Sequence, residues 1–209
     1  PYGVRNLESA RTLLAEAGYP NGIDPETGEN LEIAFDQAGS DTFYRQTAEL
    51  LATDLGQIGI KLRPAFNNRA RFFQKLAQGQ VQMFRLSWTG DYPDAENFFQ
   101  LFYSGNAEGC NRVFYKNPEF DAMYEKIRVM PPCPERTALY EKMTEHLAEN
   151  CPWIFESQPV AFILTHQWMQ NYRPHDFGFG RWKYFSVEPA LRNKARKEFT
   201  PLSMKDLRK

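Results

Sequence analysis

Strand-like and helix-like segments alternate along the first part of this sequence, and that order limits the fold more than any other feature. Residues 31–35 and 60–66 alternate apolar and polar side chains as half-buried strands do, and residues 81–88 open as a buried apolar run. Between them, residues 41–58 and 68–78 space their apolar side chains as helices do. This order favours a mainly parallel sheet with right-handed crossovers. We therefore predict an α/β fold in which helices flank a sheet of these strands.

The rest of the chain reads as mostly helical, with extended pieces toward its end. Asn6 and Asn117 are typical residues at a helix start, and Asp94 is expected to cap a short helix. Residues 153–165 and 182–187 are predicted to be extended.

Composition and charge exclude several classes of function. The chain has 209 residues, of which 42% are hydrophobic, as expected for one globular domain or one lobe of a larger protein. A net charge of -1 gives no basic field for nucleic acid. No apolar run approaches the roughly 20 residues of a membrane helix. Pro1 at the start indicates a processed or cut piece. Residues 192–209 are rich in lysine and arginine, which favours a solvated or disordered terminus over an anion-binding one.

Cysteine and histidine are too few and too widely spaced for a metal site. The chain has no Cys-x-x-Cys pair, and its 3 histidines show no zinc-site spacing. We expect no metal and no cofactor. Cys110 and Cys133 lie in loop-like stretches and could form a disulfide, whereas Cys151 is expected to be a small buried residue.

The candidate binding residues follow the third predicted strand. Trp88 and Asp91 lie at its carboxyl end, where α/β sheets place their ligands. A flat aromatic wall beside a carboxylate suits a ligand with an ammonium group and an apolar body. Arg85 is a charged residue in an otherwise apolar strand, so it calls for a partner. That partner could be a ligand carboxylate or an acid of the protein itself.

An enzymatic function is not indicated. Asp91 and Asp94 lie in one tight turn, which does not suit two carboxylates that oppose each other across a sugar. The sequence shows no local motif of a catalytic nucleophile and no glycine-rich phosphate loop. We predict a protein that is not an enzyme.

Five stretches together resemble one known family in the family's own order. They are Ala10 to Gly22 (ARTLLAEAGYPNG), Leu55 to Ile60 (LGQIGI), Trp88 to Asp94 (WTGDYPD), Tyr115 to Asp121 (YKNPEFD), and Pro134-Glu135-Arg136 with Pro152-Trp153-Ile154. The chain thereby resembles the C-terminal lobe of the family-5 extracytoplasmic solute-binding proteins of peptide and nickel ABC importers. The resemblance implies a periplasmic-binding-protein-like (type II) lobe. Residues 1–190 would form part of that lobe, and residues 191–209 a flexible basic tail.

The resemblance also implies a function and a set of binding residues. A peptide or another small solute would bind in the cleft between two lobes, of which this chain supplies part of one. In peptide-binding relatives, the acid that matches Asp91 holds the ligand's α-amino group. In some oligopeptide-binding relatives, an arginine at the place of Arg85 receives the ligand's carboxylate. Trp88 and Tyr92 complete the expected ligand-binding set. Expected partners are ABC permease subunits, and the expected location is periplasmic or extracellular. The alternative is the ligand-sensing half of a transcription regulator.

Overall fold

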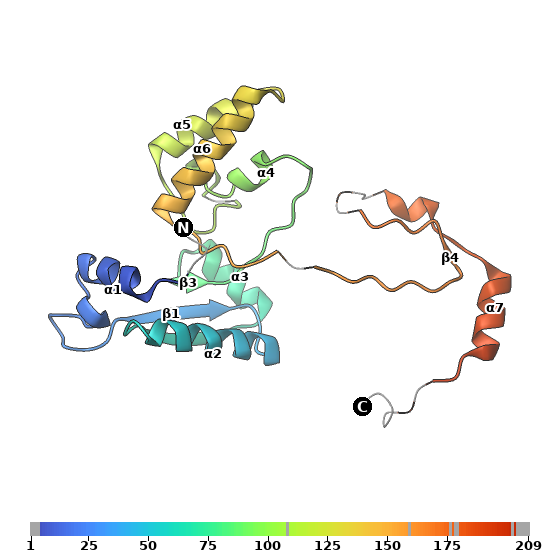
Figure 1. Cartoon of the computed structure of the whole chain (residues 1–209), viewed down its shortest axis with the longest axis horizontal. Coiled ribbons are helices and arrows are strands. Elements are labelled where there is room, and N and C mark those ends of the chain that lie inside the picture. The colour runs from blue at the N-terminus through green and yellow to red at the C-terminus, as the bar shows by residue number, and fades with distance from the viewer. Residues whose placement is uncertain are drawn as a thin grey trace. The chain divides into compact units, whose positions relative to one another are not determined.

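The computed structural model describes residues 5–107, 109–158, 160–175, 177, 180–201 and 203, and it divides into two compact units. The first unit takes in Pro1–Thr89 and Asp94–Ile154, and the second takes in Gly90–Pro93 and Phe155–Lys209. The first unit holds the parallel sheet and the helices α1 to α6 (Figure 1).

The sheet of the first unit is parallel, as predicted. Its strands are β1 (Glu32–Gln37), β2 (Lys61–Phe66) and β3 (Met83–Phe84), in the order β2-β1-β3. The prediction of a long third strand over residues 81–88 is wrong, because β3 pairs only Met83 and Phe84 with β1. The late start of the strand has its cause one residue earlier. The side-chain Oε1 of Gln82 accepts the N–H of Ala34 at 2.9 Å, so a side chain replaces the backbone there.

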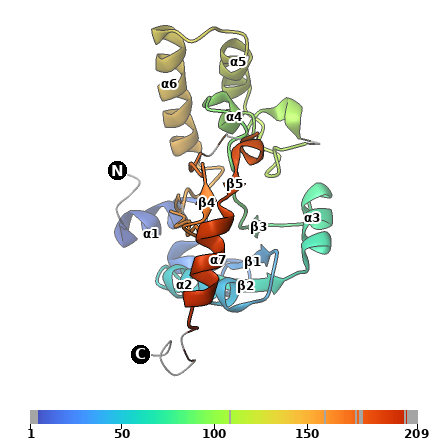
Figure 2. The same ribbon diagram turned by 90° about the vertical axis from the view of Figure 1, so that its right-hand side faces the viewer.

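Helices flank this sheet, which confirms the predicted α/β class. Helix α2 (Thr42–Gly56) buries Ala48 against Phe35 of β1 and Leu62 of β2. Its N-cap is Asp41, whose carboxylate accepts the N–H groups of the first turn. Figure 2 shows the same elements from a direction turned by 90°.

Helices α1 (Leu7–Glu16) and α3 (Arg69–Ala77) begin at the residues that the sequence indicates. Asn6 caps α1 and Asn68 caps α3, each through its side-chain oxygen. Helix α3 buries the aromatic ring of Phe72 completely. Short 3₁₀ turns cover Pro20–Gly22 and Ser104–Asn106.

Two of the family-like motifs meet at their glycines. Gly22 and Gly59 both have positive φ, 72° and 86°. A Cβ on Gly59 would lie 2.0 Å from the carbonyl oxygen of Asn21, so no larger residue fits there. This close approach joins the turn after α1 to the turn that leads into β2.

The helical part of the first unit packs around an aromatic core. It consists of α4 (Glu96–Phe99), α5 (Pro118–Ile127) and α6 (Pro134–Asn150), and α5 and α6 lie side by side (Figure 1). Asn117 caps α5 as predicted. The buried side chains of this core are Phe99, Leu101, Phe102, Phe120, Met123, Tyr124, Ile127, Met143 and Leu147.

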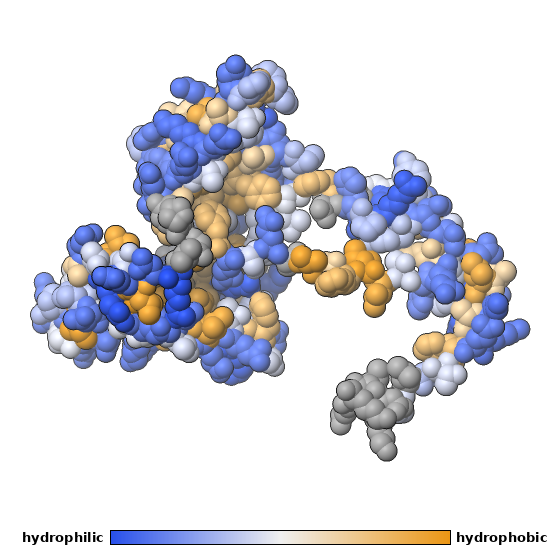
Figure 3. All heavy atoms as spheres, viewed as in Figure 1, coloured by the Kyte–Doolittle hydropathy of each residue, from blue (hydrophilic) through white to orange (hydrophobic). Residues whose placement is uncertain are grey.

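The chain from Trp153 onward differs from the predictions. Residues 153–158 and 160–165 form no strand, although they were predicted to be extended and strand-like. Phe162 and Leu164 are 90% and 95% exposed, so no second layer stabilises a strand there. Hydrophobic residues gather along this segment, between α6 and β4 (Figure 3).

The end of the described chain carries more regular structure than expected. Strands β4 (Met169–Gln170) and β5 (Ser186–Val187) pair antiparallel, and a 3₁₀ turn over Arg181–Tyr184 precedes β5. Residues 182–187 are therefore only partly extended. Helix α7 (Pro189–Glu198) occupies much of the predicted basic tail. Its exposed side chains agree with a solvated terminus. The flexibility of residues 191–209 and the boundary at residue 190 stay predictions.

The cysteines are free thiols. Cys110 and Cys133 form no disulfide, although their loop-like positions left that pairing open. Cys151 is exposed rather than buried, because it ends α6 in the left-handed region, at φ 45°. Among the described residues, no helix is long and apolar enough to cross a membrane.

Candidate functional site

Trp88 is held at one edge and open on another side. Its indole Nε1–H donates to Oδ1 of Asn97 at 2.9 Å. Asn97 is fully buried in α4, whereas the Trp88 side chain remains 37% exposed. An indole has a single polar hydrogen, so this bond satisfies it and leaves an apolar ring surface open to solvent.

Arg85 directly follows β3 and lies over a different element. Its guanidinium carbon is 5.0 Å from the centre of the Phe43 ring, which belongs to α2. This is the geometry of a cation–π contact. Trp88 and Arg85 are therefore fixed by α4 and α2 respectively.

Asp91 and Tyr92 belong to the short segment Gly90–Pro93, which groups with the second unit. Both side chains are exposed, and that of Tyr92 is 42% exposed. A side chain that binds a ligand must be accessible to it, and both of these side chains are. The assignment of Arg85, Trp88, Asp91 and Tyr92 as ligand-binding residues stays a prediction.

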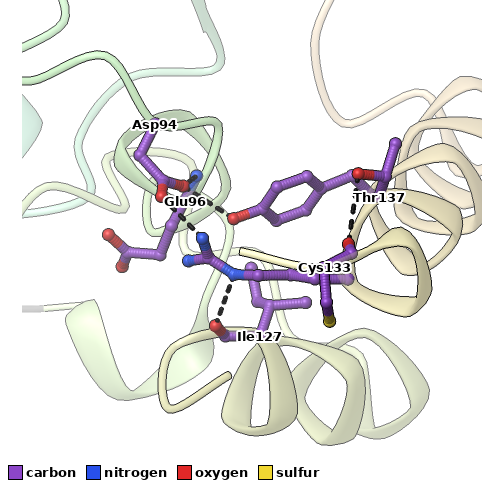
Figure 4. A network of polar contacts seen from close by, with 7 residues as sticks. Asp94, Glu96, Ile127, Cys133 and Thr137 are labelled. Atoms are coloured by element: carbon purple, nitrogen blue, oxygen red, sulfur yellow. Dashed lines mark hydrogen bonds and ion pairs between the residues drawn. The ribbon is translucent and has the colours of Figure 1, made fainter. Parts of the chain in front are cut away.

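Asp94 has a structural role, as its predicted position at a helix start suggests (Figure 4). Its Oδ1 accepts the N–H of Glu96 at 2.9 Å and the hydroxyl of Tyr140 at 2.6 Å, and its Oδ2 accepts Nη1–H of Arg136 at 2.6 Å. One detail of the prediction is wrong. Helix α4 begins at Glu96, so Ala95 occupies the N-cap position.

The contacts of Asp94 shift its own pKa and that of Tyr140. Burial alone would raise the pKa of the Asp94 carboxyl, but the bonds from Tyr140, the Glu96 N–H and Arg136 outweigh it and hold the pKa below 3.8. Burial, then the bond to Asp94, raises the pKa of Tyr140 well above 10.0. At neutral pH the network thus contains a carboxylate, a neutral phenol and a guanidinium.

Sequence reasoning gave no role to Asn97, Arg136 or Tyr140. Arg136 stood in one of the family-like stretches, but its partner Asp94 lies 42 residues away in sequence. The one local signal was the spacing of Arg136 and Tyr140, which places both on one face of α6.

A second polar cluster lies at the carboxyl ends of β1 and β2, and among the described residues its contacts are internal except at the buried Oε1 of Gln37, which accepts no hydrogen bond. The buried carboxylate of Asp36 pairs with Lys75, and it accepts Nδ2–H of Asn67 at 2.8 Å. Gln37 donates Nε2–H to the carbonyl of Tyr44 at 2.8 Å. These contacts join the ends of two strands to α2 and α3, so the cluster reads as structural.

Two surface hollows lie away from the predicted site residues. A hollow of about 660 Å³ in the second unit is lined by Asn171, Arg173, His175, Gly180, Arg181, Lys183, Tyr184 and Phe185. Another, of about 210 Å³, lies on α2 and β2. Neither is lined by the predicted site residues. Within the part of the chain that the structure describes, no group of three or more histidine, cysteine or acidic residues could hold a metal ion.

Comparisons with known proteins identify the family that the sequence motifs resemble. The family described as "Bacterial extracellular solute-binding proteins, family 5 Middle" matches residues 1–109. The chain is 29% identical over 182 residues to heme-binding protein A of Haemophilus influenzae. It is also 29% identical over 168 residues to di/tripeptide-binding protein 2 of Pseudomonas aeruginosa. These alignments cover 87% and 79% of this chain.

A solved structure shows the same fold. The oligopeptide-binding protein AppA of Bacillus subtilis, solved with a nonapeptide, matches with a TM-score of 0.72 at 18% identity, over 90% of this chain. The match covers only 38% of the AppA chain, and the two relatives above are covered to 32% and 31%. The chain thus spans about a third of the length of the curated relatives that it matches.

Proposed function

Because this chain belongs to the bacterial extracellular solute-binding proteins of family 5, we propose that it forms part of the solute-binding component of an ABC importer. Its ligand is a peptide or a related small solute. The observation that carries the proposal is the match over residues 1–109, which includes the segment with Trp88 and Asp91. The names of the relatives support binding of peptides or other solutes, and the regulator alternative draws no support from them.

The proposed site uses charge at both ends of a peptide. The Asp91 carboxylate receives the ligand's α-ammonium group through a charge-assisted hydrogen bond. The open face of Trp88 and the ring of Tyr92 contact the ligand's side chain. Arg85 receives the ligand's carboxylate, for which the planar guanidinium is suited. No bond of the ligand is broken in this scheme, so the protein acts by binding alone.

The complete binding component is larger than this chain in our proposal. The relatives are about three times as long, and their additional length would supply the second lobe that closes over the ligand. Closure removes water from the pair between Asp91 and the ammonium group and thereby strengthens it. The loaded protein would then meet the ABC permease subunits, in the periplasm or outside the cell.

Calorimetry with dipeptides tests this proposal. We expect the complete gene product to bind a dipeptide such as Ala-Phe with micromolar affinity, roughly -8 kcal/mol. The 209-residue chain alone should bind far more weakly, since one lobe supplies only part of the contacts and excludes little water. Micromolar binding by the chain alone would show that one lobe suffices. No heat from any peptide with the complete gene product would contradict peptide binding.

Arg85→Ala separates ligand binding from a structural role. We expect the variant to weaken free-acid peptides by roughly 1.5–3 kcal/mol, since a hydrogen bond to a charged group is lost. The affinity for peptides with an amidated C-terminus should fall by less. The matched control is Arg69→Ala, because Arg69 also lies over an aromatic ring, 5.3 Å from the centre of Phe73, and has no part in the proposed site. Equal losses for acids and amides would assign Arg85 a structural role.

A further inference from the structure

The orientation of the Trp88 ring depends on a residue outside the tryptophan–aspartate motif. Asn97 follows Trp88 by nine positions, and its Oδ1 accepts the only polar hydrogen of the indole, at 2.9 Å. Asn97 is 0% exposed and Trp88 is 37% exposed. A buried acceptor therefore bonds to one edge of a ring that is otherwise partly open to solvent.

Asn97 is itself fixed from several directions. Helix α4 has only 4 residues, too few to be stable alone. The N–H of Asn97 donates to the carbonyl of Asp94 at 3.2 Å. The carboxylate of Glu96 accepts the hydroxyl of Tyr124 from α5. The bond from Tyr124 thus ties α4 to α5, and the bond from the Asn97 N–H ties α4 to Asp94 just before its first residue.

Helix α6 completes this support. Arg136 and Tyr140 each bond to the Asp94 carboxylate at 2.6 Å (Figure 4). A continuous path of hydrogen bonds therefore runs from α6 through Asp94 and Asn97 to the Trp88 indole. Every residue on this path lies in the first unit.

We propose that Asn97 is a positioning residue for ligand recognition, which fixes the plane of the Trp88 indole and so sets the ligand side chains that the ring accepts. This inference rests on the proposed function, in which Trp88 contacts the ligand, whereas Asn97 does not touch it. Without the acceptor, the partly exposed indole can turn its N–H toward water. A ligand would then have to immobilise the ring as it binds, and that ordering lowers affinity.

The test is a ¹H–¹⁵N spectrum of the 209-residue chain, with Trp88→Phe to assign the indole signal. In Asn97→Leu, which keeps the volume but removes the acceptor, we expect the Trp88 indole proton to move upfield. Its hydrogen exchange should be about fivefold faster or more, as expected when a hydrogen bond of ordinary strength is lost. Asn97→Ser is the second variant if Asn97→Leu does not fold.

Asn111→Leu is the matched control. Asn111 is also 0% exposed, and it holds a loop of the same unit through bonds to Tyr103 and Tyr115. Its replacement should lower the melting temperature at least as much, yet leave the Trp88 signal unchanged. An unchanged Trp88 signal in both Asn97 variants, or an equal shift in Asn111→Leu, would overturn the proposal.

Binding by the complete gene product adds a second readout. We expect Asn97→Leu to weaken Ala-Phe by about tenfold and Ala-Gly by less than about twofold, since only the larger side chain uses the fixed ring. Equal losses would mean that Asn97 has only a structural role. If wild-type protein binds neither peptide, the proposed function fails for dipeptides, and the indole spectrum still decides whether Asn97 sets the ring.

Discussion

Arg136→Met is expected to lower the free energy of unfolding by roughly 2–4 kcal/mol, because it leaves the Asp94 carboxylate without its cation. The Arg136 side chain is 10% exposed, and Asp94, at 29%, is partly screened by water, so the cost stays below that of a fully buried pair. The variant also loses the bond from Arg136 Nε–H to the carbonyl of Ile127, 3.0 Å, at the end of α5. Urea denaturation measures the difference.

The loss should depend on pH in a defined direction. The pKa of Asp94 is lower in the folded chain than the ordinary 3.8, so its contribution is present above that value. It disappears as the pH falls through the lowered folded-state pKa. The stability gap between wild type and Arg136→Met should therefore be constant near neutral pH and shrink in strong acid.

Two further variants make the test specific. Arg128→Met removes an exposed pair with Glu125, 2.9 Å, and should cost less than about 1 kcal/mol. Asp94→Asn in the Arg136→Met background should recover part of the loss, since it removes the unpaired charge. Equal losses of stability in Arg136→Met and Arg128→Met would contradict a stabilising role for the Asp94 network.

Asp91→Ala is expected to weaken a peptide ligand of the complete gene product by roughly 2–5 kcal/mol, because the ligand's ammonium group would be enclosed without a partner. Asp91 is exposed in this chain, so its replacement should change the melting temperature little. Calorimetry gives the affinity and thermal denaturation gives the stability.

Asp54→Ala is the control for a loss of negative charge. Asp54 pairs with Arg5 at 2.8 Å on the surface of the first unit, outside the proposed site. The Asp54→Ala substitution should leave the affinity for the peptide unchanged. A large stability loss in Asp91→Ala together with full affinity would contradict the assignment of Asp91 as the ligand's anchor.

Local patterns predicted most of the sheet-bearing part of the fold. Helix starts at Asn6, Asp41, Asn68 and Asn117 were readable because the cap and the N–H groups it satisfies lie within three residues. The length of β3 was not readable. Its late start depends on the side chain of Gln82, which bonds to Ala34, 48 residues away.

The contacts that hold Asp94 could not be predicted either, because they too join residues far apart in the sequence. Tyr140 reaches Asp94 across 46 positions of sequence, and no periodic pattern reports such a contact. The motif itself was visible, since Trp88 and Asp91 stand together after an apolar run. The sequence therefore indicated the candidate ligand-binding residues and missed Asn97, which bonds to Trp88, and Arg136 and Tyr140, which bond to Asp94.

The central claim is that Asp91 binds the α-amino group of a peptide, and one thermodynamic cycle tests it most directly. Calorimetry on the complete gene product would compare a peptide with its N-acetylated form, in wild type and in Asp91→Ala. The account predicts that acetylation weakens binding to wild type by roughly 2–5 kcal/mol and hardly changes binding to Asp91→Ala. Equal losses on acetylation in both proteins would contradict it, because the amino group would then be recognised by another residue.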